Sequence, residues 1–138
     1  GMSASDSFEN EVLHYAFGVV AYTPPATWHI GLSSTDPGET GSTQTEPSGG
    51  NYARVAKTNN ATNFPNVNPL ANGTEILFPT PSANWLSGVN IGWFTLWDHA
   101  TNTAAVNFKG SGQLTDANPA LTGNIVRFPV GALQITMT

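Results

Sequence analysis

An apolar segment near the middle of the chain limits the possible folds most strongly. Residues 89–98 read VNIGWFTLWD and lie between Gly88 and a polar, turn-forming stretch. In an extended chain successive side chains point to opposite faces, and here both faces are apolar. Such a strand must be covered twice, by a second sheet, a helix or another subunit. The residues that we expect in the core of this β structure are Ile91, Trp93, Phe94 and Trp97.

Composition favours β structure with many turns. Charged residues make up only 9% of the 138 residues, and the polarity comes from Asn, Thr, Ser and 14 Gly, with 10 Pro. These residue types favour turns and extended backbone over helix. A hydrophobic content of 39% is sufficient to fill one core, which argues against disorder. We therefore expect a single domain over residues 1–138.

Charge and cysteine content exclude several classes of protein. Four basic residues and a formal net charge of −5 argue against nucleic-acid binding and against an anionic membrane surface. The chain has no cysteine, so disulfides and thiolate metal sites are excluded. No apolar run has the length of a membrane span or the pattern of a signal peptide. Gly1 before Met2 has the form of an expression-tag scar.

The order of predicted elements indicates one helix followed by strands. Apolar residues recur at helical spacing over about residues 7–17, with Asp6 as the expected N-cap, Glu9 in the capping-box position and Gly18 as the stop. Strands separated by turn signals then occupy residues 28–33, 52–57, 75–78, 89–98, 104–109, 124–128 and 132–137. No helical crossovers lie between them. This order predicts a mainly β fold, an antiparallel, jelly-roll-like sandwich over about residues 27–138.

No motif in the sequence points to an enzyme. Ser33, Ser34, His29 and Asp36 are close in sequence, but the chain has no GxSxG elbow. The three histidines do not share the spacing of a metal-ligand pair, and the loop acids lack the D-x-D-x-D-G spacing of a calcium loop. We therefore expect no catalytic residue, no metal and no cofactor.

Carbohydrate binding is the main alternative, because the chain has four tryptophans. Exposed indole rings in a row on a sheet can stack on sugar faces. Trp85 is flanked by polar and glycine residues, and it is the ring expected to be partly exposed. Together with Trp28 it is the candidate for a glycan or partner contact.

Arg54 is the polar residue most worth examining. It follows the long loop that carries Asp36 and Glu46, in a chain with very few cations. Its planar fork can bind a loop carboxylate in a bidentate way, which would make it a structural tie. The alternative is a solvated charge at the rim, which contributes little to stability.

Several short motifs, taken in order, resemble one family. They are AYTPPAT at 21–27, GLSSTDP at 31–37, EPSGGNYARV at 46–55, Phe78-Pro79, Ala83-Asn84-Trp85, Trp97-Asp98 and FPVGAL at 128–133. This order is similar to small proteins of tailed-phage and prophage structural gene clusters, usually called tail-fiber or tail proteins. The resemblance spans nearly the whole chain.

The resemblance implies a non-enzymatic virion protein of the tail that contacts itself and other tail proteins. It implies assembly in the host cytoplasm and a final place in the particle. Ring or trimer formation is common among tail parts, so a homo-oligomer is expected. The N-terminal helix either packs on its own sandwich or is donated to a neighbour. A carbohydrate-binding module for adsorption to host-surface glycans stays the alternative function.

Overall fold

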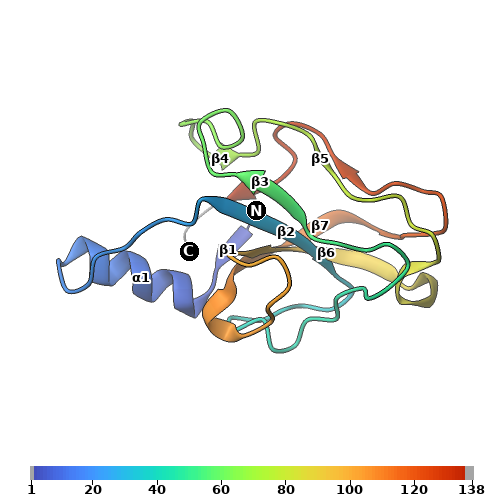
Figure 1. Cartoon of the computed structure of the whole chain (residues 1–138), viewed down its shortest axis with the longest axis horizontal. Helices are drawn as coiled ribbons and strands as arrows, with labels where there is room; N and C mark the ends of the chain where they lie inside the picture. Colours follow the sequence, from blue (N-terminus) through green and yellow to red (C-terminus); the bar gives the residue numbers. More distant parts are fainter. Residues whose placement is uncertain (1, 136–138) are drawn as a thin grey trace.

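The strand predicted from residues 89–98 is a central strand in the larger of two sheets (Figure 1). The computed structural model describes residues 2–135. Gly1 and the last two residues of the strand expected at 132–137 lie outside the described residues. The strands in chain order are β1 (Met2–Ala4), β2 (Thr27–Ser33), β3 (Val55–Thr58), β4 (Leu70–Ala71), β5 (Ile76–Leu77), β6 (Asn90–Trp97), β7 (Phe108–Pro119), β8 (Arg127–Phe128) and β9 (Gln134–Ile135). The helices are α1 (Asp6–Ala16) and two short 3-10 turns, η1 (Trp85–Gly88) and η2 (Ala105–Asn107).

Seven strands form the large sheet in the order β3-β2-β6-β7-β1-β9-β4, and β5 pairs with β8 in a second sheet. Every pairing is antiparallel except that of β1 with β9. The predicted fold class, mainly antiparallel β with one N-terminal helix, is confirmed. The arrangement is sandwich-like and is not a closed barrel.

One face of the large sheet carries the main hydrophobic cluster. Its buried members are Trp28, Ile30, Leu32, Ile76, Phe78, Trp85, Ile91, Phe94, Leu96, Ala120 and Leu133. Ile91 therefore joins Phe94 and Leu96 in one cluster, whereas simple alternation put it on the other face. A break in register explains this, because Ile91 pairs with Asn118 while Trp93 pairs with Gln113, and β7 bulges between these points.

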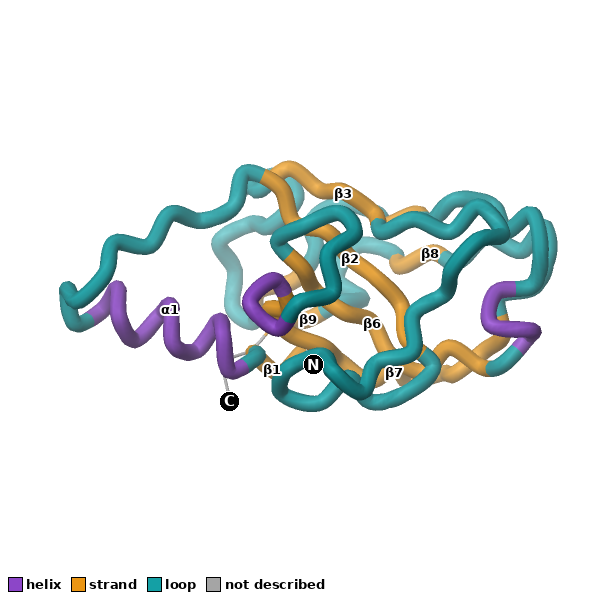
Figure 2. Tube along the Cα trace, turned by 60° about the horizontal axis from the view of Figure 1, so that its bottom comes forward, coloured by secondary structure: helices purple, strands orange, loops and turns teal. Residues whose placement is uncertain are grey.

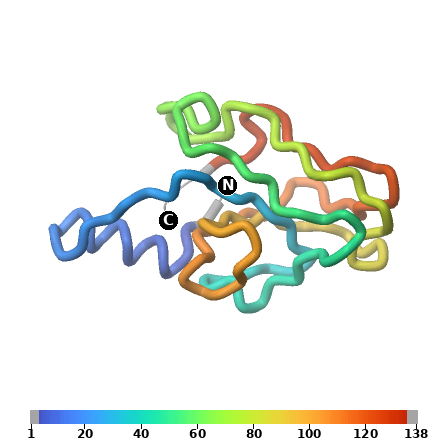
Figure 3. Tube along the Cα trace, viewed as in Figure 1, coloured from blue at the N-terminus to red at the C-terminus, as the bar shows by residue number. Residues whose placement is uncertain are grey.

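The second face of β6 is covered mainly by loops. Trp97 is fully buried there, and its ring meets Phe108 edge-on at a centroid distance of 5.0 Å. The backbone at Gly41, in the loop of residues 34–51, lies against the Phe108 ring. In Figure 3 this cyan loop and the orange loop before β7 lie on the same side of the molecule. The double coverage that the sequence required thus comes from a small sheet on one face and from loops on the other.

Helix α1 begins one residue earlier than the sequence indicated. Ser5 is the N-cap, and its Oγ accepts a hydrogen bond from Phe8 N at 3.1 Å, so the expected cap at Asp6 is wrong. None of the residues of α1 is buried. Figure 2 shows the helix extending away from the strands, with the chain returning beside it toward β2.

Other boundaries differ from the pattern in the sequence. Of the strand expected at residues 104–109, only Phe108 and Lys109 are in a strand: Ala105–Asn107 form η2, and β7 runs from Phe108 to Pro119. β3 begins at Val55 and not at Tyr52. The short strands β1 and β4 had no pattern that identified them. No described helix has the length and apolar character needed to cross a bilayer.

Candidate functional site

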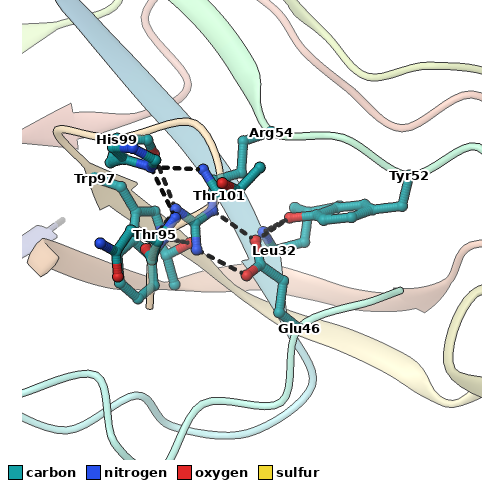
Figure 4. Close-up of polar contacts among 9 residues, drawn as sticks. Leu32, Glu46, Tyr52, Arg54, Thr95, Trp97, His99 and Thr101 are labelled. Carbon is teal, nitrogen blue, oxygen red and sulfur yellow. Dashed lines mark hydrogen bonds and ion pairs between the residues drawn. The ribbon is translucent and has the colours of Figure 1, made fainter. Parts of the chain in front are cut away.

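A group of interacting polar side chains gathers around Arg54, directly before the edge strand β3 (Figure 4). Its guanidinium forms a bidentate pair with Glu46: Nε lies 2.9 Å from Oε2, and Nη2 lies 2.9 Å from Oε1. Nη1 donates to the carbonyls of His99 and Asn102 at 2.9 and 3.0 Å. The side chain of Arg54 is only 2% exposed. Four of its five N–H donors are therefore engaged within the protein.

The guanidinium also lies over a buried aromatic ring. Its central carbon is 3.9 Å from the centroid of the Trp97 ring, a cation–π distance. The indole nitrogen of Trp97 donates to Thr95 Oγ1 at 2.8 Å. Burial of both groups strengthens the attraction, because little water competes for the cation. Arg54 thus joins the apolar second face of β6 to a charged network.

Tyr52 also contacts the Glu46 carboxylate. Its hydroxyl donates to Glu46 Oε2 at 2.6 Å and accepts from the backbone N–H of Leu32 at 3.1 Å. Burial raises the pKa of Tyr52 well above its ordinary value, and the negative charge of Glu46 raises it further. The phenol therefore keeps its proton and remains a hydrogen-bond donor to the carboxylate.

Gly31 on β2 lies against this group. A Cβ at this position would lie 2.6 Å from Thr95 Oγ1 and 2.8 Å from Glu46 Oε2, closer than real Cβ atoms come. Only glycine lets the Glu46 carboxylate come this close to the sheet. We call Glu46, Tyr52, Arg54, Thr95 and Trp97 the Arg54 cluster.

A second buried cation holds the start of α1. Lys109 on β7 is 1% exposed, and its amino group contacts Glu11, Ser7 Oγ at 2.9 Å and Asp98 Oδ2 at 3.8 Å. Asp98 also accepts from Asn107 Nδ2 at 2.8 Å. These contacts join the first turns of α1 to the large sheet. Nothing in the sequence distinguished Lys109 from an ordinary strand-end lysine, so this ion pair was missed.

The Arg54 cluster has the chemistry of a structural tie. It joins the loop of residues 34–51 and the loop after β6 to the sheet, and its members satisfy one another. It contains no nucleophile beside a base. His29 on β2 has a lowered pKa because burial and then the positive charge of Arg54 disfavour its protonated form. Among residues 2–135, no three acidic or histidine side chains are grouped as they would be around a metal ion.

The structure separates the two carboxylates that were candidates for Arg54. Glu46 makes the bidentate pair. Asp36 is exposed, and its Oδ1 accepts from the backbone N–H of Gly38 at 2.9 Å within its own turn. The tie therefore uses the carboxylate nearer to Arg54 in sequence.

The tryptophans offer little open ring surface. Trp85 is 2% exposed and donates from its indole nitrogen to the carbonyl of Gly50 at 2.8 Å, so the expected partial exposure of this ring is wrong. Trp28 is 9% exposed and packs against Phe8 at a centroid distance of 6.0 Å. Trp93 is half-buried. No row of exposed indoles lies along the described strands.

A different surface has the shape of a binding groove. Two adjoining hollows of about 510 and 260 Å³ share Leu114, Asp116, Arg127 and Phe128 in their walls. The bulge in β7 forms one wall, and β8 forms the other. Asp116 and Arg127 are exposed, and no ion pair joins them in the part of the chain that the structure describes. The groove therefore has one free charge of each sign and a half-buried phenyl ring.

Comparison with protein families identifies a family for this chain. The model of the family described as podophage GP4 fiber I protein gp80 matches residues 3–136, nearly the whole chain. The chain belongs to this fiber family. The resemblance to tail-fiber proteins that the sequence motifs indicated is therefore confirmed. The comparison with curated proteins finds no match.

Membership of the fiber family agrees with the chemistry of the site. A phage fiber family supports a structural, tail-associated role and a place in the virion with other virion proteins. The buried polar groups of this fiber-family chain serve to hold loops on a sheet. They leave no set of converging, unpaired groups inside the Arg54 cluster.

Proposed function

We propose that this chain is a non-enzymatic structural protein of a phage or prophage tail, which acts by self-assembly and by contacts with other tail proteins. The observation that carries the proposal is the match of the fiber family over residues 3–136. The Arg54 cluster supports it, because a part assembled once and kept in place benefits from loops that are held on the sheet. The protein is made in the host cytoplasm and remains in the finished particle.

Purified particles provide the test. Tails and whole particles from a density gradient are analysed by quantitative mass spectrometry, and an epitope-tagged copy is located on the particle by gold labelling. We expect the chain at a fixed copy number per particle and the label on the tail. A chain that stays in the soluble fraction of the lysate and is absent from particles would overturn the proposal.

Carbohydrate binding is the second candidate, and the groove between β7 and β8 favours it. Arg127 and Asp116 offer planar charged groups that can donate to and accept from sugar hydroxyls, and the Phe128 ring offers an apolar face. The groove takes the place of Trp28 and Trp85 as the candidate glycan contact, because both indole rings are buried. In this reading the module would contribute to adsorption on host-surface glycans.

A glycan array distinguishes the two candidates. The wild-type protein is compared with Arg127→Ala and with Asp36→Asn, which changes an exposed acid far from the groove in sequence. Binding that Arg127→Ala removes and Asp36→Asn leaves would establish the second function. An array with no bound glycan would exclude it and leave the structural function untouched.

A further inference from the structure

The far end of α1 carries an unusual group of exposed apolar side chains. We call the C-terminal half of the helix and the turn after it, residues 12–22, the arm. Figures 1 and 2 show that α1 extends beyond the edge of the sheet. Phe17 is 79% exposed and Val19 is 68% exposed. The full group of exposed apolar residues is Leu13, Tyr15, Phe17, Val19 and Val20.

The arm holds these side chains in one defined conformation. Val19 N donates to His14 O at 2.9 Å and Gly18 N donates to Tyr15 O at 3.1 Å, the two bonds of a Schellman motif. Gly18 adopts φ +69°, as this motif requires at its C′ position. Tyr15 also packs against Tyr22 on the returning chain at a centroid distance of 6.4 Å. The patch is therefore pre-organised, which lowers the entropy lost when a partner binds.

The exposed apolar side chains of the arm do not all share one face. Leu13 and Phe17 are four residues apart and lie on the same side of the helix, whereas Tyr15 lies on the opposite side. An aromatic side chain has roughly 150–250 Å² of surface, so Tyr15 and Phe17 together expose on the order of 250 Å². Leu13, Val19 and Val20 add exposed aliphatic surface, so the arm exposes several hundred Å² of apolar side chain, divided between its faces. The largest apolar patch on a typical monomer covers about 300–600 Å², and a standard interface buries about 800 Å² on each partner. The apolar area of the arm is therefore less than one side of a standard interface, so a contact between two arms must also bury neighbouring polar surface.

Charge favours a second copy of this chain as the partner. The net charge is −5, and two of the four basic residues, Arg54 and Lys109, are buried in ion pairs. Contact between two copies elsewhere on the acidic surface brings like charges together. No Asp, Glu, Lys or Arg occurs between Glu11 and Asp36. The arm is thus a surface where two copies can meet without charge repulsion.

We propose that the arms of two copies pair antiparallel about a two-fold axis near Phe17. In this orientation the two helix dipoles oppose each other, and the acidic first turns with Asp6 and Glu9 lie at opposite ends of the contact. A parallel pair would place these acids side by side. This pairing rests on the proposed structural function, and it specifies the surface through which two copies of the chain associate.

Single-cysteine variants test the symmetry, because the chain has no native cysteine. Around a two-fold axis a residue meets its own counterpart, so one cysteine per chain can form a disulfide across the contact. Leu13, Tyr15, Phe17, Val19 and Val20 are each replaced by Cys, with Val130→Cys as the exposed control. We expect a covalent dimer on a non-reducing gel for at least one arm variant and none for the control. A failure of all five to cross-link would overturn the pairing.

Sedimentation equilibrium tests the role of the apolar side chains. The double variant Phe17→Ser with Val19→Ser is expected to weaken self-association at least about tenfold, since central aromatic contacts dominate most interfaces. Val106→Ser, at an exposed valine on η2, is the matched control and is expected to leave association unchanged. A wild-type protein that is monomeric at high concentration, or equal weakening by both variants, would contradict the proposal.

The two proposals fail in different ways. A chain present in purified tails whose arm variants associate as strongly as the wild type would exclude arm pairing alone. A ring or trimer that the double variant disrupts, without any symmetric cross-link, would exclude the two-fold geometry. Absence of the chain from particles would instead exclude the structural function.

Discussion

The Arg54 cluster and the arm use their side chains in opposite ways. In the Arg54 cluster a guanidinium, a carboxylate, a phenol and an indole satisfy one another within the protein. In the arm, five large apolar side chains lie mostly in solvent. Removal of a group from the cluster leaves a buried polar atom without a partner, which is costly. Removal of a side chain from the arm changes little in the isolated chain. Mutations in the two regions should therefore separate stability from association.

The largest effect on stability is expected from Glu46→Gln. The variant leaves the buried guanidinium of Arg54 opposite a neutral amide, and breaking a buried pair costs about 3–5 kcal/mol. We expect a loss near the lower limit, about 3 kcal/mol, because the Glu46 side chain is 14% exposed. Urea unfolding measures the loss. Glu39→Gln, at an exposed acid in the same loop, is the control, and equal losses in the two variants would contradict the structural tie.

A methyl group at Gly31 should disturb the same cluster by crowding. Gly31→Ala places a Cβ 2.6 Å from Thr95 Oγ1 and 2.8 Å from Glu46 Oε2, so the sheet or the carboxylate must move. Overpacking of this kind costs about 1–3 kcal/mol. Gly92→Ala on the neighbouring strand is the matched control, since its Cβ would lie 3.9 Å from Ala117. If thermal unfolding shows the same change in midpoint temperature for both variants, the side chains of the Arg54 cluster can move to make room for the added methyl group.

Alkaline pH should weaken the contribution of Tyr52. Its pKa is raised above the ordinary value of 10.0, so above that pH the unfolded chain loses a proton that the folded protein keeps. This contribution to stability is complete below pH 10.0 and falls by up to about 1.4 kcal/mol per pH unit above it. We expect the difference in unfolding free energy between wild type and Tyr52→Phe to narrow above that pH. A constant difference across the alkaline range would show that the phenol titrates alike in both states.

The smallest effect tests the rigidity of the arm. Gly18→Ala introduces a Cβ at φ +69°, where nothing lies within 4 Å, so any cost arises from the backbone alone. We expect a loss of about 1 kcal/mol and a smaller loss for Gly18→Asn, since Asn tolerates this conformation better. Thermal unfolding followed by circular dichroism measures both. Equal stability of the wild type, Gly18→Ala and Gly18→Asn would mean that the Schellman turn does not hold residue 18 in the left-handed conformation.

Sequence patterns were reliable where one segment determines its own structure. Helical spacing located α1 to within one residue at each end, and the run from Val89 to Asp98 identified β6. The N-cap was misplaced because Asp6 and Glu9 have capping-box spacing, while Ser5 is the residue that accepts from Phe8 N. Adjacent residues with similar capping chemistry cannot be separated by spacing alone.

Features that depend on distant partners could not be predicted. The second half of β7, from Gln113 to Pro119, has polar residues and a proline and resembles a loop, but β6 pairs with it. Trp85 has polar neighbours in sequence, yet the chain at Gly50 and Ala120 encloses it. The partners of Arg54 include carbonyls at His99 and Asn102, which no side-chain pattern identifies. Tertiary contacts decided each of these positions.

The position of β1 in the large sheet also bears on how the chain folds during synthesis. Met2 pairs with Gly112 on one side and with Ile135 on the other, so both partners are more than 100 residues away in sequence. The ribosome releases the partner segments long after it has released β1. β1 therefore lacks both of its neighbours until the chain has been extended through β7 and β9, and this part of the sheet can close only then.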